Sequence, residues 1–187
     1  MDNDELKKAI ESVIFISDKP VSLKEMKKIF TDNSNKELKQ CTDCLLKDWN
    51  EINRGFSLQQ VSGGFQFRTL PEFSPYIARY KECKPFKLSR AALEVLSIIA
   101  YKQPITKIEV DYIRGVDSSG VFGVLLERGY IRISGRKEVI GRPFLYETTD
   151  EFLETFGLKN LEDLPTLKEL EEIEDTIDKS ILGLDLV

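Results

Sequence analysis

The start of the chain carries apolar residues at the three- and four-residue steps of an α-helix. Between residues 5 and 16 these positions alternate with charged ones, which predicts a helix with one buried face. Asp18-Lys19-Pro20 interrupts the pattern, and Ser22 and Glu25 then have the spacing of a capping box. We therefore expect a second helix that runs to about Phe30. The apolar positions of the first helix are Leu6, Ala9, Ile10, Val13 and Ile14.

A longer helical pattern and a strand pattern follow. Residues 35–53 have apolar side chains at helical spacing, from Leu38 to Ile52. Residues 55–61 and 65–69 instead alternate apolar and polar positions on either side of Ser62-Gly63-Gly64, which predicts a tight β-hairpin. A short helix is expected over residues 73–80.

The same order of signals returns 84 positions later in the chain. A proline turn, a capping box, a further helical segment and a hairpin occur in the same order both times, and chance agreement of so many signals would be rare. The repeat predicts an α+β fold, mainly α, made of two tandem winged-helix domains with three helices and a β-hairpin wing each. The positions matched at this offset are Pro20 with Pro104, Ser22 with Thr106, Glu25 with Glu109 and Ile29 with Ile113. Both third helices are also expected to end on a glycine and an aromatic residue, Gly55-Phe56 and Gly129-Tyr130.

Composition sets the expected domain limits. We predict a first winged-helix domain over residues 1–82 and a charged, proline-containing linker over 83–88. A second winged-helix domain is predicted over 89–160, with Ser89 as the cap of its first helix. Residues 161–187 form an acidic tail with apolar residues at helical steps, so that an amphipathic helix and a disordered tail both remain open, with partner-dependent order favoured.

The third helix of the second domain is unusual for a DNA reader. A winged helix that binds DNA places this helix in the major groove, where Arg, Lys, Asn or Gln contact base edges and phosphates. Here the segment that follows Ser118-Ser119-Gly120 is apolar, and its charges are Glu127 and Arg128 at the end. We expect its apolar side to pack in the core of its own domain.

Charge is distributed unevenly along the chain. The formal net charge is −5 overall, with 12 basic and 12 acidic residues in 1–80, 12 and 8 in 81–149, and 3 and 12 in 150–187. A strong nucleic-acid binder is expected to have a clearly basic domain, so DNA binding should be weak or indirect. Arg136, Lys137 and Arg142 make the second wing locally basic, which fits either a contact with phosphate or an acidic partner, or a solvated hairpin tip.

Several kinds of chemistry lack the residues they need. The chain has no histidine, no glycine-rich phosphate loop and no set of four metal ligands, so we predict no enzymatic activity, no cofactor and no metal site. Cys41 and Cys44 lie within a helical segment and are interpreted as small packing residues. The three cysteines and the absence of a signal peptide or a 20-residue apolar run predict a cytoplasmic protein with reduced thiols and no membrane contact.

Residues 89–165 closely resemble the bacterial segregation and condensation protein B family. The motifs that carry the resemblance are AYKQPIT at 100–106, IRGVDS at 113–118, GRK at 135–137, GRP at 141–143, TT at 148–149 and FGL at 156–158. The chain departs from the usual family pattern at Gly123, Tyr130, Ile140 and Glu147. The partner-binding residues suggested by these motifs are Tyr101, Gln103, Arg114, Gly115, Val116, Asp117, Arg136, Lys137, Gly141, Arg142 and Pro143.

The resemblance implies a non-enzymatic subunit of a chromosome-partition complex. Family members are homodimers that pair mainly through the first domain and bind the kleisin, segregation and condensation protein A, which joins the heads of the SMC ATPase. The implied role is in chromosome condensation and partition, in the cytoplasm and associated with the nucleoid. The alternative is a DNA-binding transcriptional regulator, the commonest use of a winged helix, against which the charge distribution argues.

Overall fold

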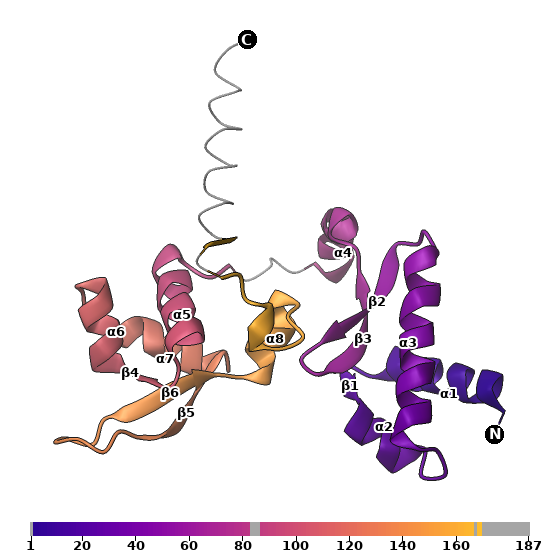
Figure 1. The fold of residues 1–187 in the computed structure, drawn as a ribbon. Coiled ribbons are helices and arrows are strands. Elements are labelled where there is room, and N and C mark those ends of the chain that lie inside the picture. Colours follow the sequence, from indigo (N-terminus) through magenta and orange to yellow (C-terminus); the bar gives the residue numbers. More distant parts are fainter. Residues whose placement is uncertain (1, 83–86, 167, 170–187) are drawn as a thin grey trace.

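The chain folds around two separate hydrophobic cores. The computed structural model describes all residues except 1, 83–86, 167 and 170–187, and Figure 1 shows the two halves side by side with helix α8 between them. We call the half that contains α1 to α4 the first domain and the half that contains α5 to α8 the second domain. Each has its own three-stranded sheet and its own cluster of buried side chains.

The first domain places three helices against a small antiparallel sheet. Strand β3 is central and pairs with both β1 and β2, so the hairpin is joined to the start of the second helix. Leu6, Ile10 and Ile14 of the first helix pack with Leu38 and Leu45 of the third. The elements are α1 (Asn3–Ile16), β1 (Val21–Ser22), α2 (Leu23–Ile29), α3 (Asn35–Glu51), β2 (Phe56–Val61), β3 (Gly64–Thr69), η1 (Pro71–Phe73) and α4 (Ser74–Lys81).

The second domain repeats this arrangement, and its fourth helix, unlike α4, contributes a buried residue to the core. Strand β6 is central between β4 and β5, and the sheet closes over a core centred on Val95, Ile99 and Leu125. Phe152 of helix α8 is buried in the same core. The elements are α5 (Arg90–Lys102), β4 (Ile105–Thr106), α6 (Lys107–Arg114), α7 (Ser119–Glu127), β5 (Ile131–Arg136), β6 (Phe144–Thr148), α8 (Asp150–Phe156) and η2 (Leu161–Asp163).

The predicted helix starts are confirmed at atomic detail. Ser22 with Glu25 and Thr106 with Glu109 both form reciprocal capping boxes, and the Ser89 hydroxyl accepts the N–H of Ala92. A third capping box, Ser34 with Glu37, starts α3. These reciprocal bonds satisfy N–H groups that have no partner within the helix, which explains why the same spacing marks the same place in both domains.

The structure confirms the predicted tandem winged-helix fold and adds features that the pattern did not show. The two-residue strands β1 and β4 were not expected, and Gly55 and Gly129 are not equivalent. Gly129 has a φ of 71° after α7, whereas a Cβ atom on Gly55 would lie 3.5 Å from the ring of Phe73. The limits of the 83–88 linker stay a prediction, and the predictions for the tail concern residues that, beyond 169, lie outside the described part.

Candidate partner-binding surface

Helix α6 leaves most of its apolar side chains in water. Of its residues only Val110 is fully buried, whereas Tyr112 is 88% exposed and Ile108 is 68% exposed. Ile113 and Val116, at and just beyond the end of the helix, are about half exposed. We call Ile108, Tyr112, Ile113 and Val116 the α6 surface. A cluster of exposed apolar residues of this kind is typical of a protein-binding surface.

A shallow hollow lies along the α6 surface. Its volume is about 420 Å³, and it is bounded by the end of α5, by β4 and by α6. Its lining combines apolar residues with two charged ones, and consists of Lys102, Pro104, Ile105, Glu109, Tyr112 and Ile113. A hollow lined by apolar and charged residues fits an amphipathic helix, which enters such a groove through a few apolar anchor side chains.

The second wing is tied to this surface by an ion pair. Lys137 Nζ lies 2.5 Å from Glu109 Oε1, and the Lys137 amide donates to the Pro143 carbonyl across the wing at 2.9 Å. At the tip, Ile140 is fully exposed. The Arg136 guanidinium lies 4.0 Å from the centre of the Phe144 ring and donates to the Arg142 carbonyl. The wing is therefore a basic and apolar extension of the α6 surface.

The ion pair between Lys137 and Glu109 predicts that the stability of the folded protein depends on pH. The Lys137 ammonium, and then the Thr106 amide, lower the pKa of Glu109 from 4.5 to about 2. Because the folded-state pKa is depressed, the stabilisation is complete above about pH 4.5 and is lost as the pH falls towards 2. In an NMR titration we expect the Glu109 carboxyl to have a midpoint of about 2. Lys137→Ala should raise that midpoint and Arg136→Ala should not. A wild-type midpoint near 4.5 would refute the wing contact.

Four of the eleven residues suggested by the family motifs make contacts within the second domain or shape its backbone. Gln103 Oε1 accepts the Thr148 amide at 2.6 Å, which joins the end of α5 to β6. The Arg114 side chain is nearly buried and bridges Glu94 and Ser118. Asp117 accepts from Lys107 and Ser119. Gly115 ends α6 at a φ of 72°. Gln103 and Arg114 therefore support the α6 surface from within the domain, whereas the Asp117 side chain is 70% exposed.

The remaining motif residues lie on or near the surface of the domain. Val116 belongs to the α6 surface, and Gly141, Arg142 and Pro143 shape the wing turn, with φ values of 86° at Gly141 and 38° at Arg142. Tyr101 is half exposed and donates its hydroxyl to the Pro165 carbonyl. Of these residues, Lys137 is joined to α6 through its ion pair with Glu109. The sequence interpretation missed Ile108 and Tyr112, which fall between motifs.

Helix α7 has the composition of a core helix. Phe122 and Leu125 are buried, and the Phe122 ring meets Tyr146 edge-on at 4.7 Å. Val124 and Leu126 are partly exposed, and Arg128 caps the end of the helix. Its outer side therefore offers apolar groups where a DNA-reading helix would present basic ones.

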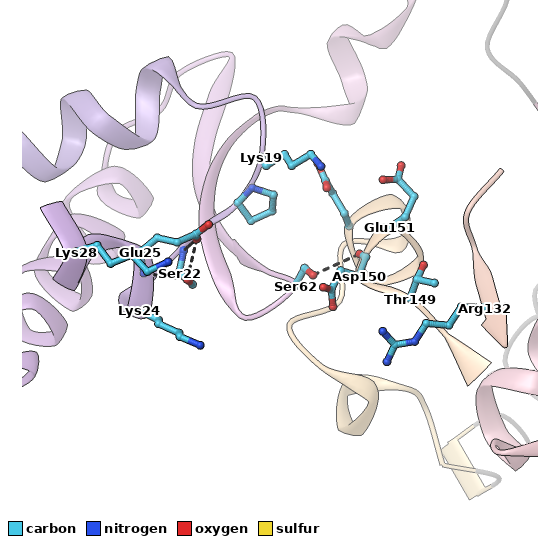
Figure 2. A pocket seen from close by; sticks show the side chains of 12 residues that line it. Lys19, Ser22, Lys24, Glu25, Lys28, Ser62, Arg132, Thr149, Asp150 and Glu151 are labelled. Atoms are coloured by element: carbon cyan, nitrogen blue, oxygen red, sulfur yellow. Dashed lines mark hydrogen bonds between the residues drawn. The ribbon is translucent and has the colours of Figure 1, made fainter. Parts of the chain in front are cut away.

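A polar cleft lies between the two domains. It has a volume of about 600 Å³ and is lined by Lys19, Lys24 and Lys28 from the first domain and by Arg132, Asp150 and Glu151 from the second. Figure 2 shows the Ser62 hydroxyl pointing across to the Asp150 carbonyl, to which it donates at 3.3 Å. The cleft is lined by both cations and carboxylates, so its charge does not favour either an anionic or a cationic ligand. We therefore interpret it as part of the contact between the two domains.

The two neighbouring cysteines differ in environment. Cys41 is buried in the first core, and burial raises the pKa of its thiol, whereas Cys44 is exposed. Packing thus explains Cys41 but not Cys44. Within the described residues no group of three or more acidic or cysteine side chains is placed to hold a metal ion. No helix of the described part is long and apolar enough to cross a bilayer.

Comparison with known proteins decides the family. The sequence model of the segregation and condensation complex subunit ScpB matches residues 8–167. The chain belongs to this family. Segregation and condensation protein B of Syntrophotalea carbinolica is 43% identical over 185 residues, which are 99% of this chain and 93% of the relative. The protein of the same description from Clostridioides difficile is 40% identical over 175 residues, 92% and 98% of the two chains.

Solved structures of ScpB proteins are also similar to the chain. The crystal structure of ScpB from Mycobacterium tuberculosis is 31% identical and aligns with 84% of this chain and 98% of its own, with a TM-score of 0.40. A crystal structure of a dimer of the ScpB N-terminal domain complexed with a ScpA peptide is 26% identical, covers 41% of this chain and 95% of its own, and has a TM-score of 0.37.

Proposed function

We propose that the protein is a non-enzymatic subunit of a bacterial SMC–kleisin complex, which acts at the nucleoid in chromosome condensation and partition. It is a homodimer that binds the kleisin, segregation and condensation protein A, and through it the SMC ATPase. Membership of the ScpB family supports this role. The main structural support for the proposed partner contact is the α6 surface, an exposed apolar face beside a basic wing.

The α6 surface and the wing form the proposed kleisin contact. Tyr112 and Ile108 are the anchors, because they are large, exposed and one helical turn apart. Gln103, Arg114, Gly115 and Asp117 position this face, and Lys137 holds the wing next to it. Arg136 and Arg142 place positive charge at the wing, which favours a partner segment with acidic residues beside its apolar ones.

The first domain is the proposed dimerisation domain. Phe15 and Ile16 at the end of α1 are 69% and 80% exposed, and Ile29 at the end of α2 is more than half exposed. Burying these side chains against a second copy would remove a substantial apolar area from water. The two proposed contacts therefore lie on different domains, so that pairing and kleisin binding can be separated by mutation.

Light scattering coupled to size-exclusion chromatography tests both assignments together. The free protein should have twice the mass of one 21.5 kDa chain, and Phe15→Asp with Ile16→Asp should reduce it to a monomer. Addition of the kleisin's central segment should increase the mass of the wild type. A monomeric wild type that gains no mass with the kleisin would overturn the proposal.

A further inference from the structure

The first wing is the hairpin of β2 and β3, and the two-residue turn at its tip faces the second domain. Val61 pairs with Gly64, and the residues between them, Ser62 and Gly63, have φ values of 50° and 67°. Two consecutive positive φ values are those of a type I′ hairpin turn. The N–H groups of Ser62 and Gly63 lie outside the pairing of β2 with β3, and a partner must come from elsewhere.

Both of these N–H groups donate to the main chain that follows α8. The Ser62 amide lies 2.8 Å from the Leu158 carbonyl, and the Gly63 amide lies 2.9 Å from the Lys159 carbonyl. Gly157, with a φ of 69°, ends α8 and turns the chain so that these carbonyls face the wing. Two adjacent main-chain bonds fix the position and direction of the turn more closely than one side-chain contact would.

The outer face of β3 adds two side-chain contacts. Phe65 and Phe67 pack towards the first core, so Gln66 and Arg68 point to the opposite face. Gln66 Nε2 donates to Glu154 Oε1 at 3.1 Å, and Arg68 Nη1 donates to the Glu154 carbonyl at 2.7 Å. That carbonyl is in the last turn of α8, where the negative end of the helix dipole favours a cation.

Each half of this contact is fixed to its own core. Strand β3 is the central strand of its sheet, and a Cβ atom on Gly64 would lie 2.9 Å from main-chain carbons of Pro20 and Val21, so the hairpin is held close to β1. On the other side, Phe152 anchors α8 in the second core. Movement of one domain relative to the other therefore has to break these bonds.

We propose that the first wing acts as a latch: its hydrogen bonds to α8 and to the residues just after it hold the two domains in one fixed arrangement in the free protein. The α6 surface and the exposed ends of α1 and α2 then have a set relative orientation before any partner binds. The latch consists of the five hydrogen bonds from Ser62, Gly63, Gln66 and Arg68. The polar cleft of Figure 2 is the space that remains beside it.

Arg68→Glu is the substitution that opens the latch most directly. It replaces a cation at the C-terminal end of α8 by an anion, so attraction becomes repulsion, while Phe65 and Phe67 keep the strand in its sheet. Arg68→Ala is the milder variant and should act in the same direction. Lys47→Glu, which makes the same charge change at an exposed position of α3, is the control. Trp49 fluorescence checks that the first domain remains folded in each variant.

Amide hydrogen exchange of the full-length chain measures the protection of the N–H groups that form the latch. In the wild type and in Lys47→Glu the Ser62 and Gly63 amides should be protected, although turn amides at the tip of a hairpin ordinarily exchange fast. In Arg68→Glu we expect their exchange to rise by at least about tenfold, together with that of 157–159, and the radius of gyration from small-angle scattering to increase. Unprotected Ser62 and Gly63 amides in the wild type, or Arg68→Glu values equal to those of the control, would overturn the proposal.

Discussion

The Tyr112→Ala variant is expected to bind the kleisin at least about 30-fold more weakly than the wild type, because removal of an interface anchor typically costs about 2 kcal/mol or more. Tyr112 is 88% exposed and lines the hollow between α6 and β4, so its ring is free to be covered by a partner. The same exposure means that the truncation leaves no internal cavity, and the stability of the fold should change by less than about 0.5 kcal/mol. Isothermal titration calorimetry with the kleisin's central segment measures the loss.

Tyr80→Ala is a matched control for this experiment. Tyr80 is also 88% exposed, but it lies on α4 of the first domain, away from the α6 surface. Its replacement removes the same atoms from an equally exposed site and should leave the affinity unchanged. Equal affinities for Tyr112→Ala and the wild type would show that the kleisin contacts another face, and a large loss in Tyr80→Ala would place it on the first domain.

The Leu125→Ala variant is expected to lose about 2–5 kcal/mol of the free energy of unfolding of the second domain, as do other buried leucines. Leu125 is fully buried on α7 and packs in the core with Ile99 and Phe122. Its side chain holds the helix that would read DNA in a regulator, so a large cost shows that this helix serves the core. Urea unfolding followed by far-ultraviolet circular dichroism measures the change.

Val124→Ala on the same helix provides the comparison. Val124 is 40% exposed, so its truncation should cost less than about 0.5–1 kcal/mol. Trp49, the single tryptophan, lies in the first domain, and its fluorescence follows that domain alone. Similar losses in Leu125→Ala and Val124→Ala would mean that α7 is not held as the structure describes.

Local rules were enough to predict the fold because its signals lie close together in sequence. The capping boxes at Ser22 and Thr106 connect residues three positions apart, and the Ser62-Gly63 turn is marked by adjacent residues. The repeat of these signals then gave the tandem arrangement. Strands β1 and β4 were missed because each has two residues, too few for an alternating pattern to appear.

The candidate site was harder to predict because burial is decided by contacts between distant segments. In α6 the apolar residues Ile108, Val110 and Tyr112 alternate with polar ones, and the sequence does not say which of them faces the core. The motif residues Gln103, Arg114 and Asp117 were taken as binding groups because they are distinctive, yet their hydrogen bonds stay within the domain. The latch joins residues 62–68 to 150–159, and no periodicity connects segments so far apart.

The decisive measurement is a titration of the full-length protein with the kleisin's central segment and, separately, with duplex DNA, over a range of salt concentrations. An SMC–kleisin subunit with an apolar contact surface should bind the kleisin saturably at physiological salt with weak salt dependence. Its DNA affinity should be no better than the ~10⁻⁴–10⁻⁶ M of non-specific binding and should fall steeply as salt rises. DNA binding tighter than this at physiological salt, together with no detectable kleisin complex, would contradict the account and favour a transcriptional regulator.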